Sequence, residues 1–289
     1  MDSPFIPPHT IQWCSLELRG LSYRLSDVLV ESDLHWEDPS REITLGYEDL
    51  HVWRARLDQL NSCTGKCRGS LSGDERRRAG RFRFQKDCER FIARRVILRT
   101  ILGYYLGIAP AHIEFTYGDF GKPELSFPTR TDLRFNLSHS DGLVFCVVAL
   151  GASVGIDVER IREVAEADKI VTYYFSSREA ADWRSLSSEE RLQAFFRHWT
   201  RKEARSKAIG CGIANELGRL QTMQAFDEIN NEARFMSSAE ANANWIVRDC
   251  VSTRGYVASI AFGLPLCRAV ERGSRLNERR LFQPHTQNF

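Results

Sequence analysis

The sequence predicts an α+β protein made of two similar lobes. Segments with the two-residue period of a strand and segments of helical period occur in both halves of the chain. The run Gly255-Tyr-Val-Ala-Ser-Ile-Ala-Phe262 echoes Gly142-Leu-Val-Phe-Cys-Val-Val-Ala149. Each run follows a polar turn and closes a segment of about 100 residues, the size of a small domain. The echo places a boundary between the lobes near residues 150–153.

The first half of the chain opens with 48 residues that carry four of the nine prolines and little periodicity, so we expect an N-terminal extension there. A first strand is expected at 51–57, a loop at 61–73 and a helix from residue 74 to about 106, which Gly107 ends. Short strands at 113–117 and 133–137 flank a turn at 118–123. The apolar run 143–150 is too short for a helix and predicts a buried central strand.

The second half of the chain begins with a strand at 154–159. A helix is expected at 161–174. Two more are expected from 175 onward and at 189–209, because Ser176 with Glu179 and Ser187 with Glu190 have the spacing of capping boxes. Late strands are expected at 245–247 and 256–262. The expected division is an extension at 1–48, a first lobe at 49–152, a second lobe at 153–268 and a polar tail at 269–289.

Composition limits the classes of function. The net charge is +2 over 289 residues, so the chain as a whole does not attract a polyanion. The eight cysteines are irregularly spaced, and no apolar run reaches the roughly 18 residues that a membrane helix needs. The first residues lack the pattern of a signal peptide. We therefore expect a cytoplasmic protein with no membrane partner.

Residues 154–159, Val-Gly-Ile-Asp-Val-Glu, place two acids on one face of a strand. The apolar side chains face the core, while Asp157 and Glu159 lie on the other face, roughly 6–7 Å apart at about 3.3 Å per residue. Gly155 leaves room on the acidic face for a large neighbour. Two like charges this close repel unless a cation lies between them. A solvated polar face and a metal site are both open interpretations.

A third carboxylate lies on the helix expected at 189–209. Glu203 continues an apolar stripe formed by Leu192, Phe195, Phe196 and Trp199. A carboxylate in such a stripe is costly unless it is paired or holds a metal. A simple helix pair with Lys207 is the alternative. Three carboxylates without His or Cys suit a hard cation, Mg²⁺ or Mn²⁺ in its place, and Mg²⁺ usually completes its shell with water and substrate phosphates.

The stretch from Asp74 to Arg95 is basic, with nine Lys or Arg residues against four Asp or Glu residues. A solvated helix face is one interpretation, and an anion site for phosphates or acidic partners is the other. A nucleic-acid-binding protein could use the same stretch. The small net charge and the lack of an accompanying stacking-aromatic motif argue against a nucleic-acid partner.

Four motifs occur in a fixed order along the chain: Gly121-Lys-Pro123, Phe135-Asn-Leu-Ser-His-Ser140, Val154-Gly-Ile-Asp-Val-Glu159, and Trp199-Thr-Arg-Lys-Glu-Ala204 with Lys207, Gly210 and Gly212. Together they resemble the monomeric, surfactin-synthetase-activating type of 4′-phosphopantetheinyl transferase, over residues 51–262. The resemblance implies two α/β lobes related by a pseudo-twofold axis, with a coenzyme A cleft between them. It also implies transfer of the phosphopantetheine arm to a serine of an apo carrier, with release of 3′,5′-ADP. The carrier could be of the acyl, peptidyl or aminoadipate-reductase type.

The resemblance also assigns residues. Asp157, Glu159 and Glu203 match positions that hold Mg²⁺ on the pyrophosphate, and Glu203 would act, directly or through a metal-bound water, as base for the serine hydroxyl. Lys207 matches a lysine at the scissile phosphate, so the expected catalytic residues are Asp157, Glu203 and Lys207. Coenzyme-binding positions are matched by Arg78, Arg81, Lys122, Pro123, Ser138, His139 and Lys207, with His139 toward the 3′-phosphate.

One departure from the family pattern lies beside the third carboxylate. Arg205 and Ser206 stand where an aromatic or aliphatic residue is expected. This departure leaves open a relative that binds coenzyme A or carrier domains without turnover. The intact set of three acids argues for an active enzyme.

Overall fold

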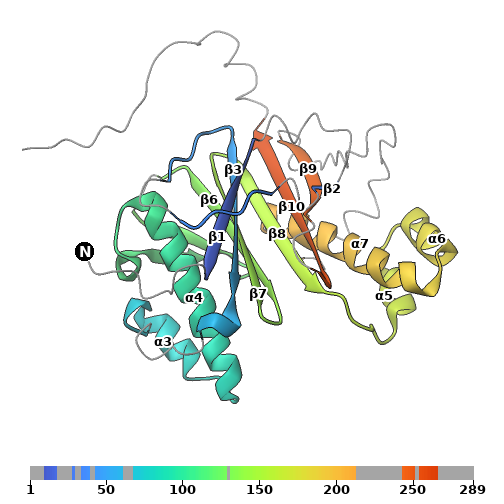
Figure 1. Ribbon diagram of the computed structural model, residues 1–289, viewed down its shortest axis with the longest axis horizontal. Coiled ribbons are helices and arrows are strands. Elements are labelled where there is room, and N and C mark those ends of the chain that lie inside the picture. The colour runs from blue at the N-terminus through green and yellow to red at the C-terminus, as the bar shows by residue number, and fades with distance from the viewer. Residues whose placement is uncertain are drawn as a thin grey trace, which may run out of the picture.

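The computed structural model describes residues 10–17, 28–29, 34–39, 43–60, 68–128, 131–212, 243–250 and 254–265. Two four-stranded sheets lie at the centre of the molecule, with a long helix against each (Figure 1). No helix among the described residues is both long and apolar enough to cross a membrane.

The first sheet has the strand order β1 (Ile11–Glu17), β3 (Asp49–Arg56), β7 (Leu143–Leu150), β6 (Leu133–Ser140), and all its pairs are antiparallel. Helix α4 (Gln85–Leu106) covers one face. Val144, Cys146 and Val148 of β7 pack in the core beneath this helix. The alternate residues of β7 pack in a second core on the opposite face. Because both faces of β7 are buried, its sequence is continuously apolar.

The second sheet has the order β2 (Val28–Leu29), β9 (Ala243–Cys250), β10 (Tyr256–Pro265), β8 (Ser153–Arg160). Only β2 pairs in parallel; the other pairs are antiparallel. Helix α7 (Ser188–Ile209) packs against this sheet. The apolar face of β8 and of β10 joins that of β3 and β7 in the second core, so the two sheets share one buried cluster.

The connectivity of the two halves repeats. Each half runs strand, long helix, strand, strand: β3–α4–β6–β7 in the first and β8–α7–β9–β10 in the second. In each sheet the last of these strands lies between the other two. The echoing runs at 142–149 and 255–262 therefore correspond to the two central strands. The pseudo-twofold axis itself stays a prediction.

The first part of the chain contains a strand that the sequence did not predict. Residues 11–17, expected in an extension, form β1 and pair with β3. Ile11 and Cys14 are buried in the cores on opposite faces of the sheet, and Leu34 is buried as well. The extension is therefore the wrong interpretation for residues 11–17. The predicted polar tail at 269–289 lies outside the described residues.

The helices follow the sequence with two corrections. The single helix expected from residue 74 to 106 is broken into α3 (Gly73–Ala79) and α4, because Gly80 ends the first helix. The helix expected at 161–174 is shorter, α5 (Ala167–Tyr174). The capping boxes at Ser176 and Ser187 are confirmed and open α6 (Ser177–Ser185) and α7. Short 3₁₀ turns are η2 (Leu57–Leu60), η3 (Arg68–Ser70) and η4 (Pro110–His112).

A separate hairpin joins α4 to β6. Its strands are β4 (Glu114–Tyr117), which was predicted, and β5 (Pro123–Phe127), which was not. The connecting turn includes Gly121, whose φ of 75° suits glycine.

Side chains, rather than backbone pairs, connect the edge strands β6 and β8. Three side chains of β6, spaced two residues apart, each accept a hydrogen bond from a backbone N–H of β8: Asn136 from Ile156 at 3.0 Å, Ser138 from Val158 at 3.4 Å and Ser140 from Arg160 at 3.0 Å. We call this contact the β6–β8 seam. It places the Asn-Leu-Ser-His-Ser motif directly beside the acidic strand.

Candidate active site

The acidic face of β8 faces α7, and Gly155 makes that contact possible. A Cβ atom on Gly155 would overlap the backbone of Ala204 and Ala208, with the Cα of Ala208 only 3.0 Å away. The room that the sequence left at this position is therefore filled by α7 itself. The close approach brings Glu203 and Lys207 of α7 to the carboxylates of β8.

Asp157 lies at the centre of the site. Its side chain is buried. Oδ1 accepts hydrogen bonds from Lys207 Nζ at 2.6 Å and Ser138 Oγ at 2.8 Å. Lys207 Nζ also donates to Ser138 Oγ at 3.0 Å. Asp157 Oδ2 is buried and has no hydrogen-bond partner among the described residues. A buried carboxylate oxygen without a partner is costly, and a cation would satisfy it.

The other two carboxylates lie in the same electrostatic field. Ser140 Oγ donates to Glu159 Oε2 at 2.8 Å. Burial raises the pKa of Glu159, and the charge of Asp157 raises it further. Burial also raises the pKa of Glu203; Lys207 lowers it, while Asp157 and Glu159 raise it. Both carboxylates therefore hold protons more tightly than usual.

These residues fit a hard cation by their chemistry. Their donors are all oxygens, and Asp157 Oδ2 is buried without a partner. As the side chains stand, no three Asp, Glu, His or Cys residues in the described part of the chain converge closely enough to form a metal site. Instead, the ammonium of Lys207 is the cation that contacts Asp157.

A row of cations extends from this site toward α3. Arg94 of α4 lies against His139, with Nη1 2.5 Å from Nε2. Desolvation, together with the positive charges of Arg94, Lys207 and Arg90, lowers the pKa of His139 to about 4. Burial and the charges of Arg90 and Arg78 lower the pKa of Arg94 to about 10. The positive charges of Arg78, Arg90 and Arg94 favour an anion between them, while a pKa of about 4 leaves His139 neutral near pH 7.

Arg94 and Arg90 are residues that the sequence analysis did not single out. Both were counted in the basic stretch at 74–95. Their spacing of four residues places them on one face of α4, which is the signal that could have distinguished them. Two other arginines of α4 form ion pairs within the fold instead: Arg95 Nε and Arg99 Nε bind the buried Glu75 at 2.5 and 2.8 Å.

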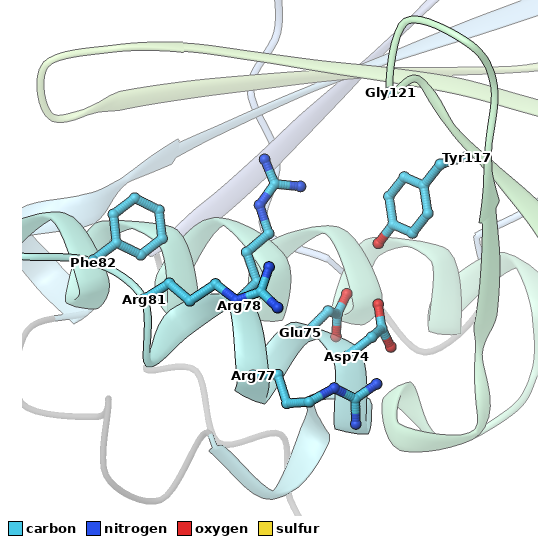
Figure 2. Close-up of a pocket in the computed structure, with 8 residues that line it drawn as sticks. All are labelled: Asp74, Glu75, Arg77, Arg78, Arg81, Phe82, Tyr117 and Gly121. Atoms are coloured by element: carbon cyan, nitrogen blue, oxygen red, sulfur yellow. The ribbon is translucent and has the colours of Figure 1, made fainter.

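A pocket of about 770 Å³ opens beside the row of cations, where the predicted Arg78 and Arg81 lie. It is lined by Asp74, Glu75, Arg77, Arg78, Arg81, Phe82, Tyr117 and Gly121. Figure 2 shows that α3 and the residues after it form one wall, and that Tyr117 and Gly121 of the hairpin form the opposite wall. The pocket therefore combines guanidinium groups with aromatic surface.

The resemblance assigned Lys122 to coenzyme binding, and the structure adds contacts within the chain that the sequence did not predict. Its Nζ donates to the carbonyl oxygens of Lys207 at 2.6 Å, Ala208 at 3.1 Å and Val154 at 3.4 Å. Burial lowers its pKa to about 8. These contacts join the hairpin to the last turn of α7, and Pro123 begins β5 directly after it.

The departures Arg205 and Ser206 are both buried. Ser206 Oγ donates to the carbonyl of Cys211 at 3.2 Å, just beyond the end of α7. They therefore lie on the packed side of α7 rather than at its exposed surface.

Comparison with known proteins identifies the family. A model described as the N-terminal part of 4′-phosphopantetheinyl transferase matches residues 53–151, and one of the 4′-phosphopantetheinyl transferase superfamily matches residues 153–261. The 4′-phosphopantetheinyl transferase HetI of Nostoc sp. is 42% identical over 62% of this chain and 76% of its own length. The chain belongs to the 4′-phosphopantetheinyl transferase superfamily.

Two further relatives support the same family. A putative 4′-phosphopantetheinyl transferase of Synechocystis sp. is 33% identical over 52% of this chain and 61% of its own length. The L-aminoadipate-semialdehyde dehydrogenase-phosphopantetheinyl transferase of Rattus norvegicus is 26% identical over 68% of each chain. The α+β fold and the enzyme class are thereby confirmed: the protein is a phosphopantetheinyl transferase, whose substrates are coenzyme A and a carrier protein.

Proposed function

We propose that the transfer takes place where β8, α7 and the β6–β8 seam meet. The observation that carries the proposal is the contact of Asp157 with Lys207 and Ser138, from three separate elements, at the end of a row of cations. A pyrophosphate substrate needs both features: ligands for a divalent ion and positive charge for its oxygens.

Binding of coenzyme A is assigned to the cationic row and the pocket. Arg78 and Arg81 lie in the pocket wall, and Arg94 with His139 lies between this wall and Lys207. Guanidinium groups bind phosphate oxygens through paired hydrogen bonds. We assign Arg94 and His139 to the 3′-phosphate, and Lys207 with Ser138 to the pyrophosphate. Lys122 holds the hairpin that forms the far wall through its bonds to α7, and Pro123 pairs with Tyr117 within that hairpin.

The chemical step is a displacement at phosphorus. The Oγ atom of the carrier serine forms a bond to the phosphorus next to the pantetheine arm, and the bond from that phosphorus to the bridging oxygen breaks. The leaving group is 3′,5′-ADP. Glu203 takes the serine proton, a role that suits a carboxylate whose pKa is raised. Lys207 stabilises the charge that develops on the phosphate oxygens.

Asp157, Glu159 and Glu203 would hold Mg²⁺, or Mn²⁺ in its place. When bound, the ion neutralises charge on the pyrophosphate and its leaving oxygen. Ser138 and Ser140 hold two of these carboxylates through hydrogen bonds of 2.8 Å. The serines therefore fix the orientation of the ligands from the neighbouring sheet.

We also assign the protein to the surfactin-synthetase-activating, monomeric type. The support is that one chain supplies every residue of the site, from β6 in the first half and from β8 and α7 in the second. Acyl, peptidyl and aminoadipate-reductase carriers are the proposed partners, and the cytoplasm is the proposed location because it holds coenzyme A and apo carriers.

Mass spectrometry of apo carriers tests the function directly. Each carrier is incubated with the full chain, coenzyme A and Mg²⁺. A gain of roughly 340 Da, the phosphopantetheine arm, is expected on at least one carrier. Asp157→Ala should slow the gain by about 100-fold or more, because it removes the carboxylate that contacts Lys207 and that would hold Mg²⁺.

Asp182→Ala is the matched control, since Asp182 lies on α6 with a side chain 70% exposed. It should leave the rate unchanged. If no carrier gains mass while coenzyme A still binds, the protein is a binding-only relative and the proposed reaction is wrong.

A further inference from the structure

The site brings three carboxylates into one electrostatic field. Asp157 is buried, and the charges of Asp157 and Glu159 act on Glu203. A buried carboxylate without a positive partner strongly destabilises the folded state. The metal-free protein therefore needs a cation of its own at this position.

Lys207 supplies that cation. Its Nζ lies 2.6 Å from Asp157 Oδ1 and 3.0 Å from Ser138 Oγ. The contact uses one carboxylate oxygen, while Oδ2 stays buried without a partner among the described residues. An ammonium on a flexible stem can occupy such a position and leave it again.

We propose that Lys207 is a stand-in cation that competes with the divalent ion for Asp157. In the metal-free protein it neutralises the buried carboxylate; when the ion binds, Lys207 is released and its ammonium becomes available to a substrate phosphate. This inference rests on the proposed function, because it takes Asp157, Glu159 and Glu203 as the ligands.

The competition has a direction that can be measured. A positive charge in contact with a ligand opposes the approach of a second cation. Replacing Lys207 by an uncharged side chain therefore strengthens binding of the ion, although it removes a residue that the reaction uses. A lysine that served only the substrate, with its ammonium away from Asp157, would change the affinity for the ion much less.

The experiment is a titration of the full chain with Mn²⁺ alone, without coenzyme A, in which the free ion is counted by electron paramagnetic resonance. Lys207→Met should bind Mn²⁺ about tenfold more tightly than the wild type, or better. Lys207→Arg keeps the charge and should stay within about twofold of the wild type. The matched control is Lys202→Met on the same helix, because Lys202 pairs with Glu179 instead, at 2.9 Å.

The outcomes separate the two proposals. Equal or weaker binding by Lys207→Met, with normal binding by the wild type, overturns the stand-in role alone. No binding by the wild type or any variant overturns the proposed metal site. If Lys207→Met is unfolded without metal, its thermal midpoint is followed against Mn²⁺ instead. A larger rise than in the wild type then supports the inference, and an equal or smaller rise contradicts it.

Discussion

Arg94 is the residue whose contacts most directly suggest a role in substrate binding. It contacts His139 and lies near Arg90 and Arg78, and the charges of the three arginines favour an anion between them. Arg94→Ala should raise KM for coenzyme A by about tenfold, because a charge-assisted phosphate contact is lost. The kcat should change by less than about threefold, since Arg94 is assigned to the 3′-phosphate and not to the reacting phosphorus.

The same kinetics with dephospho-coenzyme A give the control for Arg94. This substrate lacks the 3′-phosphate, so its KM should be nearly the same for the wild type and for Arg94→Ala. Arg83→Ala is the matched variant, because Arg83 is exposed and lies over the Phe84 ring. An equal rise in KM for both substrates would contradict the assignment to the 3′-phosphate.

His51 makes the fold sensitive to acid. It is buried beneath the Trp13 ring, and its Nδ1 lies 2.8 Å from the Tyr105 hydroxyl. Burial lowers its pKa to about 4. In the unfolded chain His51 binds a proton near pH 6.5, whereas in the folded protein it does so only near pH 4. Protonation therefore favours the unfolded chain, so the stability of the folded protein is fully present above pH 6.5 and falls as the pH drops toward 4.

His51→Gln removes that proton uptake and keeps an acceptor for Tyr105. Between pH 7 and pH 5 the free energy of unfolding of the variant should fall by about 2 kcal/mol less than that of the wild type. Urea titrations at the two pH values measure the difference. Identical losses in the two proteins would show that His51 is not the group responsible.

At the scale of elements, the contact between β8 and α7 depends on one glycine. A Cβ on Gly155 overlaps the backbone of α7, which has no side chain to move aside. Gly155→Ala should lower the free energy of unfolding by about 3 kcal/mol or more. It should also reduce transfer activity, because Glu203 and Lys207 move away from Asp157.

Gly142→Ala is the matched control for this change. A Cβ on Gly142, in the β6–β7 turn, meets nothing within 4 Å. Its free energy of unfolding should stay within about 1 kcal/mol of the wild type. If the two alanine variants are equally stable, the close packing of α7 on β8 is not as tight as the structure has it.

Elements with a local signal could be predicted from the sequence. The capping boxes of α6 and α7 lie within a few residues of chain and were found. The edge strand β1 was missed because its partner β3 lies more than 30 residues away along the chain, so local periodicity carried little of the information. The break at Gly80 was missed because basic residues continue across it.

The residues of the site, too, could be predicted from the sequence only where their signal is local. The sequence placed Asp157 on the face opposite the core and Glu203 and Lys207 on one face of a helix, and the structure brings these faces together. Which side chain would contact which depended on long-range packing. The bonds of Lys122 to α7 and of Arg94 to His139 join segments far apart in the chain, and no periodicity indicates them.

At the scale of the whole molecule, the two halves share a core. Apolar side chains of β3 and β7 pack with those of β8 and β10 in one buried cluster. Neither sheet can lose its partner without exposing that cluster, so we expect both to unfold in one cooperative step. Hydrogen exchange should give the amides of β7 and β10 the same limiting free energy of opening.

A difference of more than about 2 kcal/mol between these two strands would show instead that one half opens alone. The amides of α5, whose helix has a single buried residue, serve as an internal reference for local opening. They should exchange sooner than either central strand.

The β6–β8 seam also limits how this protein can be rebuilt from parts. Ser138 and Ser140 each hold a β8 backbone N–H and a carboxylate of the site with the same hydroxyl. Neither segment can be exchanged alone for that of a distant homologue without disturbing both architecture and chemistry. A chimera that takes residues 133–140 from another enzyme must also take residues 153–160. The two motifs therefore form one functional unit, although they lie in different parts of the sequence.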